Sequence, residues 1–173
     1  MSYKDYMKLD FDQNRTTFKR YRERIEFIKP YVNGTILDIG GENYFSKVMK
    51  GKLRVPIDNT TGDIDYGINA PLNKYDLIIC SHIIEHVMNP LVVMDGIREH
   101  LSGRAIIIYP VNIRMLKGCV HFHEIPPKDI RNLIEKAGLE IERWEVKRFQ
   151  GTWFGIRPLI RKIFYKEHFI VVK

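Results

Sequence analysis

Apolar residues recur at helical spacing in the first part of the chain. Between residues 14 and 31 the apolar positions are Phe18, Tyr21, Ile25 and Ile28, separated by polar and basic residues. This pattern predicts an amphipathic helix whose outer face is basic. The basic residues assigned to that outer face are Arg15, Lys19, Arg20, Arg22 and Arg24.

The pattern then changes to short, β-rich apolar runs separated by helical segments. Seven strands are predicted, at residues 35–41, 53–58, 63–67, 75–81, 104–109, 139–146 and 168–173. The helices predicted between them cover residues 44–50, 90–101 and 127–137. Continuous apolar strands that alternate with helices are typical of a parallel sheet covered on both faces. The fold class is therefore α/β, a Rossmann-like three-layer sandwich.

Length and composition favour a single domain over residues 1–173. The chain has 173 residues, of which 45% are hydrophobic, and shows no repeat or linker. We divide it into a basic N-terminal helix (1–32), a Rossmann-like core (33–146) and a basic segment with the final strand (147–173). No apolar run is long enough to span a bilayer and the start is polar, so we expect a cytoplasmic protein. Cys80 and Cys119 are expected to be free thiols.

The net charge of +7 is concentrated at the two ends of the chain. Residues 1–29 carry eight Lys and Arg against five Asp and Glu, and residues 143–173 carry eight against two. Residues 30–142 carry twelve against fourteen. An anionic partner is therefore expected to bind the ends of the chain rather than the centre, although an ordinary solvated surface explains the same charges.

The strand at 35–41 ends in Gly40-Gly41, at the position where α/β sheets receive ligands. The dinucleotide fingerprint needs further glycines to admit a pyrophosphate, and here Glu42 follows instead, which disfavours NAD and FAD. Asp58, at the end of the next strand, has the side chain that accepts hydrogen bonds from ribose hydroxyls. These residues favour a nucleoside ligand without a pyrophosphate.

Six fragments in order give the chain a resemblance to a known family. They are Ile36-Leu37-Asp38-Ile39-Gly40-Gly41, Val55-Pro56-Ile57-Asp58, Tyr75-Asp76-Leu77-Ile78-Ile79-Cys80-Ser81, Ile84-Glu85-His86-Val87-Met88-Asn89-Pro90, His121-Phe122-His123-Glu124-Ile125-Pro126 and Ala137-Gly138-Leu139-Glu140-Ile141. Together they resemble the class I S-adenosylmethionine-dependent methyltransferases of the small methyltransferase-domain type. The resemblance implies a mostly parallel seven-stranded sheet with one antiparallel strand near the C-terminus.

The same resemblance implies how S-adenosylmethionine binds. Asp38 would hold the methionine ammonium group, Gly40 and Gly41 would lie against the cofactor, and Asp58, with Asn59 beside it, would hold the ribose. The family usually places an adenine-binding Asp where this chain has Gly67. Asp65 or the backbone near Ile68 would then replace it, and Ser81 and His82 would lie beside the sulfonium and its methyl group.

Catalytic residues are hard to identify because methyl transfer needs mainly alignment and exclusion of water. A general base matters only for some acceptors. His82 and His123 are the candidates, since both are expected beside the acceptor, although His82 is also explained as a polar loop residue. For Glu85 and His86 we favour capping and packing at the start of the helix. A metal site at His121, His123 and Glu124 is disfavoured, because this pattern does not show a complete ligand set.

The acceptor is expected in a pocket near His82, Tyr109 and His123, and the sequence does not identify it. Methylation of base amino groups is disfavoured, since Ser81-His82-Ile83-Ile84 replaces the Asn/Asp-Pro-Pro-aromatic turn of related enzymes. We expect a small molecule or a soluble polymer. Two alternatives stay open. One is a non-catalytic binding or scaffold domain, suggested by Glu42, Tyr44 and Gly67. The other is a methyltransferase associated with RNA or membranes through the basic ends.

Overall fold

The computed structural model describes residues 15–111, 123–148 and 166–173. Within these residues six strands form one sheet, in the order β2-β1-β3-β4-β6-β5. The strands are β1 (Ile36–Ile39), β2 (Asp58–Asn59), β3 (Tyr75–Ser81), β4 (Leu101–Val111), β5 (Ile141–Arg148) and β6 (Lys166–Val172). Neighbouring strands from β2 to β4 pair in parallel, whereas β6 is antiparallel to both β4 and β5. The predicted α/β class with one reversed strand near the C-terminus is confirmed.

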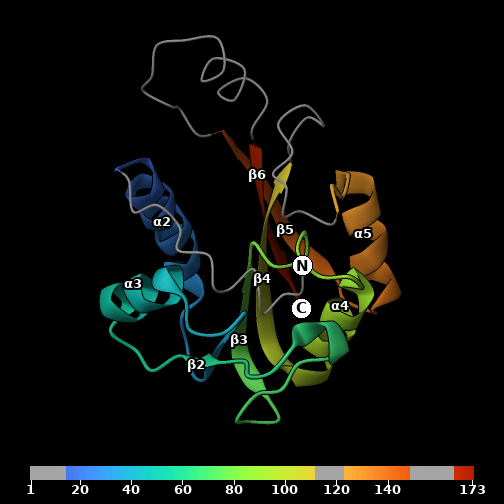
Figure 1. Cartoon of the computed structure of the whole chain (residues 1–173), viewed down its shortest axis with the longest axis horizontal. Coiled ribbons are helices and arrows are strands. Elements are labelled where there is room, and N and C mark those ends of the chain that lie inside the picture. The colour runs from blue at the N-terminus through green and yellow to red at the C-terminus, as the bar shows by residue number, and fades with distance from the viewer. Residues whose placement is uncertain (1–14, 112–122, 149–165) are drawn as a thin grey trace.

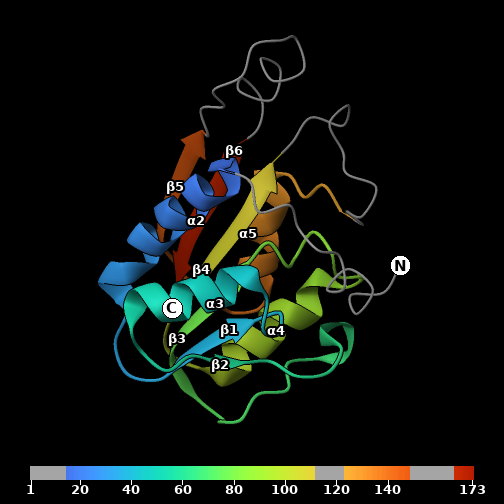
Figure 2. The same ribbon diagram turned by 60° about the vertical axis from the view of Figure 1, so that its left-hand side comes forward.

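Helices cover both faces of the sheet. They are α2 (Arg15–Ile28), α3 (Tyr44–Leu53), α4 (Pro90–His100) and α5 (Pro127–Lys136), with short 3₁₀ helices η1 (Lys29–Tyr31) and η2 (Ile64–Tyr66). Figures 1 and 2 show α2 and α3 on one face and α4 and α5 on the other. The three layers predicted from the alternating pattern are therefore present.

Each face of the sheet has its own apolar core. Along β4, Ile106 and Ile108 pack with the core under α2 and α3, while Ile107 and Tyr109 pack with the core under α4 and α5. This alternation is what a strand buried on both faces requires. It also fixes the direction of each side chain at the end of a strand, where the candidate site lies.

The region between β2 and β3 differs from the prediction. The strand expected at residues 63–67 is the 3₁₀ helix η2, so the described sheet has six strands rather than seven. Asp63 caps this helix by accepting a hydrogen bond from the Asp65 backbone N–H. Gly62 and Gly67, on either side, have φ values of 81° and 129°, which do not suit an extended strand.

The second strand is also shorter than predicted. Helix α3 continues to Leu53, and Arg54 ends it with a left-handed φ of 55°. The chain therefore reaches the sheet only at Asp58, and β2 has two residues instead of six. Both differences shorten the part of the sheet that lies beside β1.

No helix in the described part of the chain is long and apolar enough to cross a membrane. Cys80 is buried and free, as expected. Cys119, His121 and much of the two basic ends, at residues 1–14 and 149–165, lie outside the described residues. Predictions that depend on those residues stay predictions.

Candidate active site

The glycine turn after β1 has the backbone that the sequence predicts for ligand approach. Gly40 and Gly41 have φ values of 120° and 73°, which side chains rarely allow. The Gly40 N–H donates to Thr60 Oγ1 at 2.9 Å, and this bond joins the turn to the end of β2. The following Asn43 caps α3 by accepting from the Ser46 N–H at 2.9 Å. A side chain of the protein itself thus caps the helix N-terminus that would bind a pyrophosphate in a dinucleotide fold.

Asp38 is a buried acid on β1, immediately before the turn, with an exposed fraction of 2%. Its Oδ2 lies 3.5 Å from Asn59 Nδ2, and Ser46 also donates to the carboxyl group. Burial raises its pKa to about 7, although Ser46, Lys50 and Asn59 act in the opposite direction. Asp38 forms no ion pair within the described residues. A buried carboxyl group of this kind favours a bound cation.

The two residues of β2 differ in how far their side chains are engaged. The Asn59 Nδ2 group also donates to Gly41 O at 3.2 Å and to Ser46 Oγ at 3.0 Å, so this amide ties the turn to α3. Asp58 Oδ2 accepts from the Tyr75 hydroxyl at 2.9 Å. The other oxygen, Oδ1, accepts no hydrogen bond from the described part of the chain. The Tyr75 hydroxyl therefore orients a carboxylate that can still accept a ligand hydroxyl.

The region predicted to contact adenine has an open backbone at Gly67. A side chain added at Gly67 would meet no atom within 4 Å, which indicates open space at that position. Asp65 Oδ1 accepts from the Met88 N–H at 2.6 Å and so holds the turn that precedes α4. Ile68 packs against α4 at Gly96, where an added Cβ would lie only 2.8 Å from the Ile68 side chain. Asp65 and Ile68 thus support this region structurally.

Ser81 and His82 lie at the carboxyl end of β3, as predicted. The Ser81 Oγ atom is buried and has no hydrogen-bond partner among the described residues. His82 has a left-handed φ of 57°, and its backbone N–H donates to Ile108 O of β4 at 2.8 Å. This conformation is costly for a residue with a side chain, and it marks the position as constrained by its surroundings.

A buried ionic network surrounds the His82 imidazole. Arg24 of α2 donates to Glu167 of β6 through both Nε (3.0 Å) and Nη2 (2.7 Å). The same Nη2 atom lies 2.7 Å from His82 Nε2, and His82 Nδ1 lies 3.0 Å from Glu85 Oε1. Arg24 is 7% exposed and Glu167 0%. The interpretation of Arg24 as part of the basic outer face is therefore wrong, because this arginine points inward.

The charges of this network shift the pKa of every titrating member. Burial and the Arg24 guanidinium lower the pKa of His82, but Glu167 and Glu85 outweigh them and the net shift is upward. Burial alone would raise the pKa of Glu85 and Glu167. The neighbouring His82 and His86 lower the pKa of Glu85, and Arg24 and His82 hold that of Glu167 well below its usual range. Both carboxyl groups are therefore ionised at neutral pH.

Other predicted pocket residues lie apart from this network. His123 Nε2 lies 3.1 Å from Met88 O, and its backbone N–H donates to Glu85 O at 3.2 Å, so it borders the turn that holds Glu85. Tyr109 packs on the α5 face, with its ring 5.1 Å from that of His168, and its buried hydroxyl has no hydrogen-bond partner among the described residues. Tyr109 and the His82 network therefore belong to opposite faces of the sheet.

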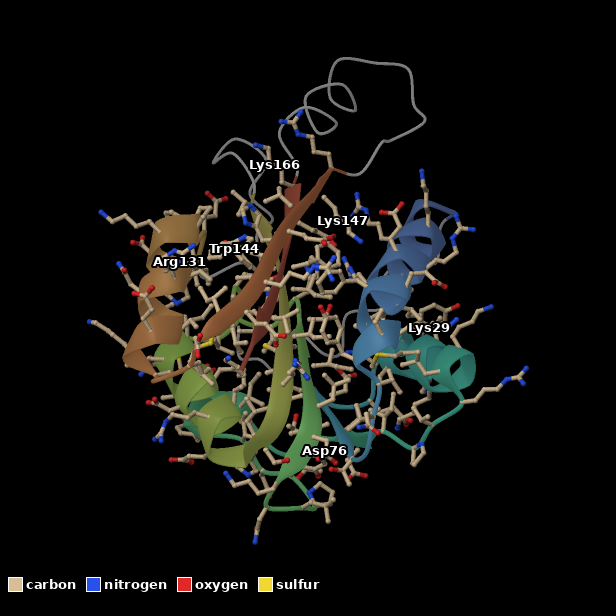
Figure 3. The ribbon with its side chains drawn as sticks, turned by 180° about the vertical axis from the view of Figure 1, so that it is seen from behind. Lys29, Asp76, Arg131, Trp144, Lys147 and Lys166 are labelled. Atoms are coloured by element: carbon tan, nitrogen blue, oxygen red, sulfur yellow. The ribbon has the colours of Figure 1, made fainter. Side chains whose placement is uncertain are left out.

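Figure 3 shows the same division of faces along β5. Trp144 faces α5, where the Arg131 guanidinium lies 5.1 Å from its ring, and it donates to His168 Nδ1 at 2.9 Å. Lys147 instead lies toward α2, with its Nζ 4.8 Å from the ring of Phe169. Asp76, which accepts hydrogen bonds from Thr35, lies at the opposite end of the sheet from Lys166. The network around His82 lies at the Lys166 end, on the α2 side, because it joins Arg24 of α2 to Glu167.

Two central residues of this site were not predicted from the sequence. Arg24 follows the helical pattern of solvated basic residues, and nothing local distinguishes it from Arg22. Glu167 offers one usable signal, since an acid just before the apolar run Phe169–Val172 needs a partner if it is buried.

Within residues 15–111, 123–148 and 166–173, no three His, Cys, Asp or Glu side chains are arranged to hold a metal ion.

The glycine turn, the acids of β1 and β2, and the open region at Gly67 lie in an α/β domain of the Rossmann-like class. A sequence-family model described as "Methyltransferase domain" matches residues 13–143. The chain therefore belongs to the methyltransferase-domain family. The family implies S-adenosylmethionine as the cofactor. No curated protein matches the chain significantly in sequence.

Solved structures share this fold at low sequence identity. A SAM-dependent methyltransferase from Archaeoglobus fulgidus has a TM-score of 0.63 at 13% identity, over 93% of this chain and 95% of the other. A methyltransferase from Mesorhizobium loti has a TM-score of 0.56 at 17% identity, over 87% and 95%. The [4+2]-cyclase SpnF has a TM-score of 0.61 at 11% identity, over 96% and 85%. At these identities the likeness shows the fold alone.

Proposed function

We propose that the chain is an S-adenosylmethionine-dependent methyltransferase, formed by one domain over residues 1–173. The observation that carries the proposal is the buried Asp38 carboxyl group beside the turn at Gly40 and Gly41. Its pKa is raised to about 7 because no partner in the described part of the chain compensates its burial fully. The ammonium group of the cofactor supplies such a charge, so Asp38 holds the methionine end.

The remaining cofactor contacts follow the carboxyl ends of the strands. Asp58 Oδ1 accepts from a ribose hydroxyl, while Asn59 acts mainly through Asp38. Adenine lies in the open space at Gly67, beside Ile68. Ser81 Oγ and His82 lie beside the sulfonium. S-adenosylmethionine supplies an electrophilic methyl group there, and the protein aligns it with the acceptor and excludes water.

The sequence departures that suggested a degenerate domain leave this turn intact. Glu42 is exposed and forms an ion pair with Lys50 at 3.3 Å, so its charge is matched within the protein. Tyr44 packs beside Tyr21, with ring centroids 5.9 Å apart. These contacts favour cofactor binding over the scaffold alternative. Because one structural neighbour, SpnF, is a [4+2]-cyclase, the fold does not by itself specify methyl transfer.

The acceptor is a small molecule or a soluble polymer that reaches the methyl group near His82 and His123. The acids nearest His82 are each matched by a basic group, Glu167 by Arg24 and Glu85 by His82 itself, so the charge of the acceptor is left open. The basic ends of the chain are a separate feature, and they would serve an anionic partner only outside this site.

Isothermal titration with S-adenosylmethionine and S-adenosylhomocysteine tests the proposal. We expect one-to-one binding of both ligands to the wild type, and loss of binding in Asp58→Ala. Asp129→Ala, an exposed acid at the start of α5, is the matched control and should bind as the wild type does. A folded wild-type protein that binds neither ligand at millimolar concentration would leave the scaffold alternative.

A further inference from the structure

Arg24 and Glu167 are buried together beside His82, and neither the family match nor the sequence pattern identifies them as functional. We propose that Arg24 and Glu167 are positioning residues, which hold the His82 imidazole in one orientation at the carboxyl end of β3. This role rests on the proposed function, because that function places His82 beside the transferred methyl group. The experiments below let the two fail separately.

The pair that holds His82 is unusually well fixed. Arg24 reaches Glu167 with two hydrogen bonds of 3.0 and 2.7 Å, a geometry that leaves the guanidinium little freedom. The guanidinium carbon also lies 5.7 Å from the ring centroids of both Tyr21 and Phe45, which limit its movement from the α2 and α3 side. Arg24 is therefore a rigid anchor between a helix and a strand.

His82 is held on both edges of its ring. Arg24 Nη2 lies 2.7 Å from Nε2, and in the neutral imidazole it donates to that atom, which leaves the proton on Nδ1. Nδ1 faces Glu85 Oε1 at 3.0 Å. With both ring nitrogens engaged, a left-handed backbone that is costly in isolation becomes the stable one.

This arrangement changes the role expected of His82. His82 Nε2 lies 2.7 Å from Arg24 Nη2 and 3.3 Å from Glu167 Oε1, and Nδ1 lies 3.0 Å from Glu85 Oε1. Neither ring nitrogen is therefore open to a proton from the acceptor. His82 then acts by fixing the end of β3 and closing α2 against the site. Among the described residues, three charged groups face it, namely Arg24 from α2, Glu167 from β6 and Glu85 from the turn after β3.

The ring of His82 reports the network directly, in NMR spectra of protein with ¹⁵N-labelled histidine. Its signal is assigned by comparison with His82→Asn, since asparagine tolerates a left-handed φ. Arg24→Met should raise the pKa of His82, because Arg24 lowers it, whereas Glu167→Gln and Glu85→Gln should reduce it. A purely structural role does not predict these opposite shifts. Arg22→Met, an exposed arginine of the same helix, should leave the signal unchanged.

The second readout is the affinity for S-adenosylmethionine by titration calorimetry. Arg24→Met should weaken binding about tenfold or more, because the end of β3 loses its fixed position. Arg24→Lys keeps the positive charge but cannot form the paired guanidinium hydrogen bonds to Glu167. It serves as the second variant if Arg24→Met does not fold. Unchanged His82 titration and affinity in folded Arg24 variants overturn the inference. Absence of cofactor binding in the wild type would instead overturn the proposed function, while the His82 spectra still test the network.

Discussion

Two carboxyl groups are buried in the sheet, and their charge states differ for one reason. Asp38, on β1, is buried without an ion pair in the described structure, and its pKa rises to about 7. Glu167, on β6, is just as buried, but Arg24 holds its pKa well below the usual range. The same desolvation acts on both, so the difference lies in the neighbouring cation.

The protein supplies a cationic partner for one of these acids but not for the other. The cation that pairs with Glu167 is Arg24 of α2, so this ion pair is part of the folded protein. Asp38 has hydrogen bonds from Ser46 and Asn59 but no such cation, which suits a group that meets a charged ligand. Substitutions that remove the cation or the acid test whether this difference holds.

The largest effect is expected where the built-in cation is removed. Arg24→Met leaves Glu167 buried and unpaired and should lower the free energy of unfolding by about 3–5 kcal/mol, measured by urea denaturation. The double variant Arg24→Met with Glu167→Met should recover much of the loss, because no charge then stays buried. A small loss of free energy of unfolding in Arg24→Met would contradict the idea that Glu167 depends on a cation supplied by the protein. Arg22→Met, being exposed, should leave the midpoint unchanged.

Asp38→Asn tests the half of the site that awaits a ligand. The variant keeps hydrogen-bonding capacity but cannot carry the charge, so S-adenosylmethionine should bind with about 2 kcal/mol less free energy, or roughly thirtyfold more weakly. Calorimetry measures this change. Stability at pH 8 should not fall, because the substitution removes a carboxylate that is costly to bury. Unchanged affinity would show that Asp38 does not contact the cationic end of the cofactor.

The pH dependence of stability tests the same difference with a smaller effect. Between its ordinary pKa near 3.8 and the folded value of about 7, Asp38 is protonated in the folded state and ionised in the unfolded one. The folded state then binds more protons, so this group's contribution to stability falls as pH rises through the window. From pH 5 to pH 7 the wild type should lose about 2 kcal/mol relative to Asp38→Asn. Parallel denaturation curves for the two proteins at both pH values would contradict the raised pKa.

The sequence predicted those parts of the fold that local patterns determine. Strand β3 has the predicted ends, Tyr75 and Ser81, because its apolar run is bounded by polar residues. Helix α4 starts at Pro90 as predicted, since Asn89 caps it and proline suits a first turn. The sequence did not predict the 3₁₀ helix that replaces the strand expected at 63–67. The positive φ values of Gly62 and Gly67 and the cap at Asp63 favour the helix, and a short β-like pattern of apolar residues does not reveal them.

The candidate site was predictable on one side only. Asp38, the glycine turn and Asp58 were each predicted in or directly after a strand, so their closeness follows from the pairing of neighbouring parallel strands. Arg24 and Glu167 are 143 positions apart, and no local pattern relates them. The helical periodicity assigned Arg24 to solvent because it treats every basic residue on a polar face alike. Glu167 meets Arg24 of α2 only because β6 lies beside β4.

The position of β6 also has a consequence for how the protein folds. Strand β6 lies between β4 and β5, and β5 has no other partner in the described sheet. Neither β5 nor the bond from Arg24 to Glu167 can therefore form before β6 is in place. Contacts this distant in sequence carry a loop-closure cost early in folding, which slows the reaction. The half of the sheet from β2 to β4 has no such dependence on β6, so the bond from Arg24 to Glu167 is expected to form late in folding.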